Sequence, residues 1–272
     1  MIPLRGILAV RALGCGLLAL ALLARGEDAE APPPFITTPT DVVEHMLRLA
    51  GTAADDVVMD LGSGDGRIVI AAARRFGARG IGIELDGKLV ERSRENARLA
   101  GVAERVSFVE GDVLQADLSK ATVVTVYLLP GLLGKLQPRF VYELAPGTRI
   151  VSHAFSMPGW RPDRLEHMAV KEPHPRQGDD STLYLWIVPA EARGAWVGGG
   201  WRLKVDQSYQ DIGVEGTREG RPVAFGEARI TGREIAWRSG AAFFRGRVAG
   251  ERMTGTLTEG GATQALELSR ER

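Results

Sequence analysis

Residues 57–67 read Val-Val-Met-Asp-Leu-Gly-Ser-Gly-Asp-Gly-Arg, with three glycines directly after an apolar run. The apolar run Asp56–Leu61 predicts a buried strand, and Arg67–Phe76, beyond the glycines, has the apolar spacing of a helix. Glycine lets the backbone pass close to a ligand, and the N-terminus of the next helix presents free N–H groups. The stretch therefore predicts a ligand-binding turn between a strand and a helix of an α/β unit.

The spacing of the glycines separates two classes of ligand. A dinucleotide fingerprint, G-x-G-x-x-G, that starts at Gly62 and Gly64 needs a third glycine where the chain has Arg67. The third glycine is Gly66 instead, and Asp60 stands just before the turn. A carboxylate there suits a ligand with an ammonium group rather than a pyrophosphate, and S-adenosylmethionine (SAM) carries one. The pattern therefore favours SAM over a nucleotide or a dehydrogenase cofactor.

Two further carboxylates follow the next two expected strands. Glu84 ends the second strand and is placed to accept hydrogen bonds from both ribose hydroxyls of the ligand. Asp112, followed by Val113, comes after the third strand and is placed to meet the adenine amino group. Because the carboxyl ends of parallel strands share one crevice, the three carboxylates together predict a SAM site. Taken singly, each is explained equally well as the cap of the next helix.

Strand and helix patterns alternate from residue 56 onward. Nearly continuous apolar strands that alternate with helices predict a Rossmann-like, doubly wound, mostly parallel seven-stranded sheet, closed by an antiparallel hairpin across the polar stretch Lys171–Ser181. Before it we expect a helix capped by Thr40 or Asp41, with Glu44 approximately completing a capping box. The expected strands are Asp56–Leu61, Gly80–Glu84, Val106–Glu110, Thr122–Leu128, Thr148–Ser152, Leu165–Val170 and Thr182–Val188, and the other expected helices are Arg67–Phe76, Leu89–Leu99 and Leu132–Leu144.

After Pro189 the chain changes to short alternating runs with glycines at the turns. Two of its segments are similar at a period of about 18 residues, Arg229-Ile230-x-Gly232-x-x-Ile235 and Arg247-Val248-x-Gly250-x-x-Met253. Residues 195–272 are therefore expected to form a small antiparallel β domain, either a meander or a small barrel. Its expected strands are Trp201–Val205, Val223–Ile230, Glu234–Trp237, Ala242–Val248 and Met253–Leu257.

The N-terminus has the pattern of an export signal. Arg5 and Arg11 precede the uncharged run Ala12–Ala24, which is typical of a secretory signal peptide and short for a membrane span. We expect residues 1–26 to be the signal and residues 27–40 a linker, with Pro32–Pro34 stiffening it. The protein is then exported to the periplasm or another extracytoplasmic space. It contacts a membrane only through the signal, if the signal stays uncleaved; a buried helix is the alternative.

Composition excludes several kinds of site. Lys and Arg together number 34, as do Asp and Glu, and this balance disfavours a protein held on nucleic acid by bulk charge. The only cysteine is Cys15, inside the apolar run, so the rest of the chain has no disulfide, no Cys-ligated zinc and no Cys nucleophile. His45, His167 and His174 lack metal-ligand spacing. We therefore expect no nucleic-acid partner and no metal.

The region from about Phe35 to Pro189 resembles the class I SAM-dependent methyltransferases. It looks most like the small protein-lysine methyltransferases of mitochondria and their exported bacterial relatives. The likeness rests on the D-L-G-S-G-D-G-R motif at 60–67, the aromatic–threonine–proline segment at 35–39, and the apolar L-x-P at 128–130. It implies a methyltransferase domain at 41–190, with residues 27–40 also covering the donor. The donor-binding residues are then Thr37, Asp60, Gly62, Ser63, Gly64, Glu84, Asp112 and Val113.

The acceptor is less defined than the donor. The more distant non-SET histone-lysine methyltransferases carry an Asn where this chain has Tyr127. Tyr127, with Phe155 and Trp160, is a candidate lining for an apolar channel that would keep a lysine amine neutral. Core packing is the alternative for Phe155 and Trp160. His153, expected at the crevice rim, is a candidate base or a structural histidine.

Three functions follow from these patterns. The first is transfer of a methyl group from SAM to a protein lysine or to a small molecule. The second is SAM binding without catalysis, by a sensor or scaffold, because an exported enzyme needs SAM outside the cytoplasm. The third, a nucleotide-binding protein, is disfavoured by Arg67.

Overall fold

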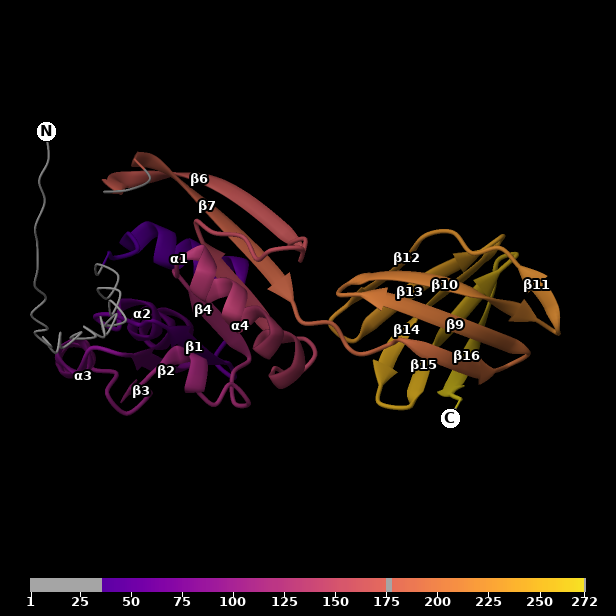
Figure 1. Cartoon of the computed structure of the whole chain (residues 1–272), viewed down its shortest axis with the longest axis horizontal. Coiled ribbons are helices and arrows are strands. Elements are labelled where there is room, and N and C mark those ends of the chain that lie inside the picture. Colours follow the sequence, from indigo (N-terminus) through magenta and orange to yellow (C-terminus); the bar gives the residue numbers. More distant parts are fainter. Residues whose placement is uncertain (1–35, 175–177, 272) are drawn as a thin grey trace, which may run out of the picture. The chain divides into compact units, whose positions relative to one another are not determined.

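The computed structural model describes residues 36–174 and 178–271 (Figure 1). The expected signal at 1–26, and the linker as far as residue 35, lie outside the described residues, so export stays a prediction. Within the described part of the chain, no helix is both long and apolar enough to cross a bilayer.

Seven strands form the first sheet: β1 (Val57–Leu61), β2 (Arg79–Glu84), β3 (Val106–Glu110), β4 (Val123–Val126), β5 (Arg149–His153), β6 (Arg164–His174) and β7 (Gly178–Ile187). Their order is β3-β2-β1-β4-β5-β7-β6. The strands from β1 to β5 pair in parallel, and β7 is antiparallel to both β5 and β6. The strand order reverses between β1 and β4, which is the topological switch point where doubly wound sheets bind ligands. The predicted Rossmann-like fold is confirmed.

Helices cover both faces of this sheet (Figure 1). Four of them are α1 (Thr40–Leu49), α2 (Arg67–Phe76), α3 (Gly87–Leu99) and α4 (Pro130–Glu143), and a short 3-10 helix, η1, spans Val113–Gln115. Successive strand residues alternate between two cores. Val58 and Val123 pack with α1, α2 and α3, whereas Met59 and Val124 pack with α4. The strands are therefore buried on both sides, which explains their nearly continuous apolar runs.

The start of α1 differs from the predicted capping box. The cap residue is Pro39, and no side chain caps the helix. Glu44 forms ion pairs with Arg48 and with Arg75 of α2 instead of reaching back to the helix start. Asp41 accepts a hydrogen bond from the backbone N–H of Lys171 in β6, 2.9 Å away. Asp41 also accepts from the N–H of Val42 at 3.1 Å, so it still bonds the first turn of α1, whereas Glu44 is used in ion pairs.

The closing hairpin is longer than predicted. The polar stretch expected to separate its strands is mostly strand, because β6 runs to His174 and β7 starts at Gly178. Residues 178–180 are exposed. A solvent-exposed strand does not require apolar residues, so the polar residues of this stretch did not indicate where the pairing of β6 with β7 ends.

The C-terminal part forms a second, antiparallel sheet, here called the barrel. Its strands are β8 (Gly194–Gly198), β9 (Trp201–Ser208), β10 (Asp211–Arg218), β11 (Arg221–Val223), β12 (Ala228–Thr231), β13 (Glu234–Ser239), β14 (Ala242–Ala249), β15 (Arg252–Glu259) and β16 (Ala262–Arg270). β9, at one end of the strand order, pairs with β10, which is next to the other end, so the sheet closes on itself. Of the two predicted forms, the barrel is the one observed. Its interior is filled by large apolar side chains, including Trp196, Trp237 and Phe244.

The repeated segments of the sequence are two hairpins of the barrel. Gly232 turns the chain between β12 and β13, and Gly250 turns it between β14 and β15, with φ angles of +56° and +59°. Three strands were missed entirely: β8, β10 and β16. β10 has no buried residue, and β16 buries only Leu266 and Leu268. Without an apolar alternation, the sequence carried little strand signal there. The single strand expected at Val223–Ile230 is divided between β11 and β12.

Candidate functional site

A glycine-rich turn joins the carboxyl end of β1 to the start of α2. Gly62, Gly64 and Gly66 have φ angles of +81°, +54° and +80°, which side-chain-bearing residues rarely adopt. A Cβ atom on Gly66 would lie 2.7 Å from the ring of Phe108, so space as well as conformation demands glycine there. The N–H groups of Gly62 and Ser63 both donate to the carbonyl of Ile83 in β2 at 2.9 Å. The turn is therefore held by the neighbouring strand.

Asp60 lies at the switch point, opposite Thr125 of β4 in the strand register. It is 3% exposed, and the Thr125 hydroxyl donates to its Oδ1 at 2.7 Å. Burial raises the pKa of Asp60 to about 7, the hydrogen bond from Thr125 opposes that rise, and the charges of Glu84 and Asp65 add to it. A buried carboxyl with a raised pKa gains strongly from a cation, which stabilises its charged form.

Glu84 ends β2 and already accepts three backbone hydrogen bonds. The N–H of Gly64 donates to its Oε2 at 2.8 Å, and the N–H groups of Leu85 and Asp86 donate to its Oε1 at 2.8 and 3.0 Å. A carboxylate has about four lone-pair positions, so one remains, on Oε2. Glu84 thus ties the glycine turn to β2 and keeps one accepting position for a ligand hydroxyl, rather than positions for two.

Asp112 and Val113 lie where the chain leaves β3. Asp112 is exposed and caps η1, because its Oδ1 accepts from the N–H of Leu114 at 2.8 Å. Asp112 therefore acts as a helix cap, which is the alternative role given for it above. The cap uses Oδ1 and does not use Oδ2. Val113 is buried, and the guanidinium of Arg139 in α4 donates to its carbonyl at 3.2 Å. Arg139 also donates to the carbonyls of Leu114 and Ala116, so it clamps the whole of η1.

Ser63 supplies a buried polar atom inside the turn. The residue is 5% exposed, and its Oγ has no hydrogen-bond partner among the described residues. A Cβ atom on Gly82 of β2 would lie 2.6 Å from this hydroxyl, so the neighbouring strand leaves room for it. A buried hydroxyl without a partner is costly in a folded protein. The atom is suited to a polar group of a bound ligand.

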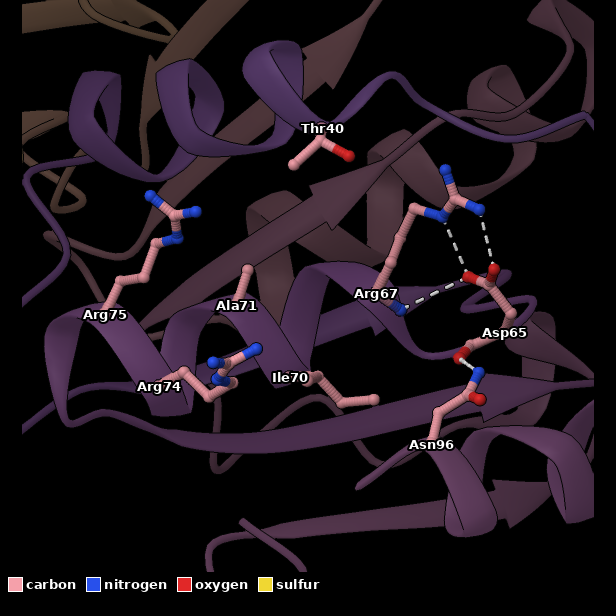
Figure 2. Close-up of a pocket in the computed structure, with 8 residues that line it drawn as sticks. All are labelled: Thr40, Asp65, Arg67, Ile70, Ala71, Arg74, Arg75 and Asn96. Atoms are coloured by element: carbon pink, nitrogen blue, oxygen red, sulfur yellow. Dashed lines mark hydrogen bonds and ion pairs between the residues drawn. The ribbon is translucent and has the colours of Figure 1, made fainter. Parts of the chain in front are cut away.

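A second link joins the turn to the segment before α1. The guanidinium of Arg67 donates hydrogen bonds to both carboxylate oxygens of Asp65, at 2.9 and 2.6 Å, and to the carbonyl of Thr38 at 2.9 Å. Burial raises the pKa of Asp65, but the hydrogen bonds and charge of Arg67 outweigh burial, so the net pKa lies below its usual value. Asn96 of α3 donates to the Asp65 carbonyl at 2.9 Å. Asp65, Arg67 and Asn96 line an open pocket of about 340 Å³ together with Arg74 and Arg75 (Figure 2).

The acceptor-side candidates form a cluster around the buried His153 at the end of β5. His153 has no exposed surface; its Nδ1 lies 3.2 Å from the Thr38 hydroxyl and its Nε2 lies 3.1 Å from the Ser181 hydroxyl. The ring of Tyr127 lies on that of His153, with centroids 4.3 Å apart, and Phe155 stacks against Tyr127 at 6.3 Å. The expectation that His153 stands at the crevice rim is wrong. Both its ring nitrogens face hydroxyls, which favours the structural interpretation over that of a base.

The three remaining expected residues divide between the site and the core. Thr37 is half-buried, and Thr38, rather than Thr37, makes the hydrogen bonds that hold this segment. Phe155 is half-buried beside Tyr127. Trp160 is 1% exposed and stacks on Tyr209 of the barrel, with ring centroids 4.9 Å apart. Core packing, the alternative interpretation, is therefore correct for Trp160.

The structure brings most of the predicted donor residues together. Asp60, Gly62, Ser63, Gly64 and Glu84 are linked through the turn and the adjacent strands β1 and β2, and Asp112 and Val113 follow the next strand, β3.

Four contributors were missed by the sequence reasoning: Thr125, Asp65, Ser181 and Arg139. A signal existed for Thr125, which is the one polar residue in the buried strand Val-Val-Thr-Val. Ser181 and Arg139 act across more than 20 residues of sequence and left no local signal.

Comparison with known proteins shows that the chain is similar to SAM-dependent methyltransferases. Residues 60–164 match the family model described as the ANTKMT methyltransferase domain. A protein-lysine N-methyltransferase of Saccharolobus islandicus is 39% identical over 156 residues, which span 57% of this chain and 93% of that relative. An adenine nucleotide translocase lysine N-methyltransferase of Mus musculus is 36% identical over 129 residues, which span 47% of this chain and 56% of the relative.

A solved structure shares the same fold. It is described as an RNA methyltransferase from Salinibacter ruber in complex with S-adenosyl-L-homocysteine, the demethylated product of SAM. It is 50% identical, covers 57% of this chain and 95% of its own, and superposes with a TM-score of 0.52. The names of these similar proteins agree on methyl transfer and differ on the acceptor.

Proposed function

Because the chain belongs to the family of class I SAM-dependent methyltransferases with the ANTKMT methyltransferase domain, we propose that it methylates a lysine side chain of a protein. The enzyme uses SAM as its methyl donor. The observation that carries the choice of acceptor is the 39% identity to an archaeal protein-lysine N-methyltransferase over nearly its whole length. The glycine motif by itself supports the donor only.

In this proposal the donor lies at the carboxyl ends of β1, β2 and β3. Asp60 pairs with the ammonium group of SAM, because it is a buried carboxyl that gains from a cation. Glu84 accepts a ribose hydroxyl at its remaining Oε2 position, and Asp112 faces the adenine. Gly62 and Gly64 let the backbone approach the ligand. The residues present therefore fit the donor that the family uses.

The acceptor side is assigned to Tyr127 and Phe155. A lysine amine must be neutral to attack, and apolar, aromatic surroundings lower its pKa. The amine nitrogen forms a bond to the donor methyl carbon while the carbon–sulfur bond breaks, the electron pair stays on sulfur, and the methylated amine then releases a proton to water. Such an in-line displacement depends mainly on alignment of the two reactants. A base role for His153 is not needed.

RNA is a second candidate acceptor, favoured by the description of the 50% identical structure. One feature of this chain weighs against it. Its formal charge is zero, whereas proteins that hold nucleic acid by their phosphates usually carry a basic excess.

The test supplies both acceptor classes at once. Purified full-length enzyme is incubated with methyl-tritiated SAM and with either the protein fraction or the RNA fraction of cells that lack the gene. We expect label in the protein fraction, recovered as methyl-lysine after acid hydrolysis. An Asp60→Ala variant, which lacks the partner for the donor ammonium, controls for background label. Label in RNA alone would refute the lysine proposal, although the enzyme would remain a methyltransferase.

A further inference from the structure

Residues 154–163 connect β5 to β6 and carry one of the acceptor-side aromatics. The segment begins at Ala154, whose φ of +70° is unusual for a residue with a side chain. The hydroxyl of Ser152 donates to the carbonyl of Phe155 at 2.6 Å, and Phe155 stacks against Tyr127. The course of this segment therefore decides where Phe155 stands relative to Tyr127.

The far end of the segment is held by a turn of the barrel. Tyr209 and Gln210 join β9 to β10, and Gln210 is only 1% exposed. The indole Nε1 of Trp160 donates to Gln210 Oε1 at 2.9 Å, and Gln210 Nε2 donates to the carbonyl of Arg161 at 2.5 Å. The ring of Tyr209 lies parallel to that of Trp160, within 7°. Both polar groups of Gln210 are thus used to hold the same segment.

Two further groups make the attachment rigid. Gln137 of α4 donates through Nε2 to the carbonyl of Pro158 and to the hydroxyl of Tyr209, both at 2.8 Å. The indole of Trp186 in β7 donates to the carbonyl of Trp160 at 2.9 Å. The segment is therefore clamped between the first sheet and the barrel. An exposed ion pair between Arg161 and Asp211 adds little, because water screens it.

The chemistry of the contact is more specific than packing requires. An apolar residue at position 210 would fill the space but would leave the buried Trp160 indole N–H without a partner and would remove the hydrogen bond to the Arg161 carbonyl. Buried polar networks whose members are all satisfied specify one geometry. Tyr209 accepts a φ of +54° to reach its position, so the turn is also shaped for this contact.

We propose that Gln210 is a positioning residue for methyl transfer, supplied by the barrel. It holds Trp160 and Arg161, and thereby fixes the segment that places Phe155 against Tyr127. The inference rests on the proposed acceptor site and assigns the barrel a part in it. Gln210 itself contacts neither the donor residues nor Tyr127 through any interaction that the structure describes.

The test compares full-length wild type with Gln210→Ala and Gln210→Met. Three quantities are measured: the SAM dissociation constant by calorimetry, the acceptor kcat/KM with methyl-tritiated SAM and the protein fraction of cells lacking the gene, and hydrogen exchange at residues 154–163. We expect kcat/KM for the acceptor to fall by about tenfold or more, since small misplacements near a reacting centre have large effects on rate. SAM affinity should stay within about twofold. Exchange should quicken in residues 154–163 and not in β1.

Two controls make the result specific. Gln264→Ala removes an exposed glutamine from β16 of the same barrel and should change none of the three quantities. Gln210→Met keeps the volume of the side chain and removes its hydrogen bonds. If Gln210→Met matches the wild type, packing alone explains the contact and the proposal is overturned.

Other outcomes also decide. Wild-type kcat/KM in Gln210→Ala overturns the proposal, and so does an equal loss of SAM affinity and rate, because that indicates general destabilisation. If the wild type forms no methyl-lysine at all, the proposed function fails. In that case hydrogen exchange alone tests whether Gln210 holds the segment. Unchanged exchange at residues 154–163 in the Gln210 variants refutes the inference, and faster exchange there supports it.

Discussion

The raised pKa of Asp60 makes SAM binding depend on pH. Burial raises the pKa of this carboxyl to about 7, in spite of the hydrogen bond from Thr125. If Asp60 receives the donor ammonium, SAM binds the ionised form and releases a proton wherever the free enzyme holds one. Affinity should therefore increase as pH rises toward 7.

The size of the effect follows from that pKa. About one Asp60 in a hundred is ionised at pH 5 and about half at pH 7, so the apparent affinity should rise about 50-fold across this window. An α-amino group has a pKa of about 7.7–8.0, so the ammonium of SAM stays charged throughout. The assay is titration calorimetry at pH 5, 6 and 7 in two buffers, which also measures the proton released.

Two variants and a control sharpen the assay. Asp60→Asn removes the titrating group, so it should bind SAM weakly at every pH, with a flat profile. Thr125→Val removes the hydrogen bond that lowers the pKa of Asp60, so the rise in affinity should move to higher pH. Asp206→Asn alters an exposed carboxylate of β9 and should retain the wild-type profile.

The same shift acts on stability with the opposite sign. The folded-state pKa of Asp60 is raised above the unfolded value, so its stabilising contribution is full below pH 4 and is lost as pH rises through 7. Relative to Asp60→Asn, the wild type without SAM should lose about 1.4 kcal/mol of unfolding free energy per pH unit, and about 4 kcal/mol in all.

A wild-type SAM affinity that is constant from pH 5 to 7, or a pH slope of SAM affinity that survives in Asp60→Asn, would refute the reasoning.

Four further predictions concern the donor, the acceptor, the barrel and the signal. Glu84→Ala should weaken SAM binding by about 1–3 kcal/mol in calorimetry, since it unties Gly64 and loses a ribose contact; SAM affinity equal to that of the wild type would contradict this. Tyr127→Ala should leave SAM affinity nearly unchanged and lower turnover; a matching loss of affinity would place Tyr127 in the donor site. A chain truncated before Ala195 should retain SAM binding but melt at a lower temperature, because Trp160 loses Tyr209 as its stacking partner; failure of the truncated chain to fold would show that the two parts share an indispensable core. Residues 1–26, fused to a reporter enzyme that is active only outside the cytoplasm, should confer activity, and an inactive fusion would argue against export.

The donor half of the site was predictable because its determinants are local. The turn at 62–66 requires left-handed backbone, which only glycine adopts readily, so the glycines in the sequence indicate the turn directly. Apolar runs marked the strands because both faces of the sheet are covered, and the order of strands along the chain carried Asp60, Glu84 and Asp112 to one edge. Where a strand had water on one face, as in β10, the same reasoning found nothing.

The acceptor half was decided by tertiary contacts. Nothing near His153 in the sequence indicates that its two nitrogens face Thr38 and Ser181, residues 115 and 28 positions away. The role of Trp160 likewise depended on Gln210, 50 residues further on. Local backbone preferences and strand periodicity are properties of neighbouring residues, and they can be read from a sequence. The pairing of buried polar groups across the fold depends on the relative positions of whole helices and strands. Those positions are determined only by tertiary packing.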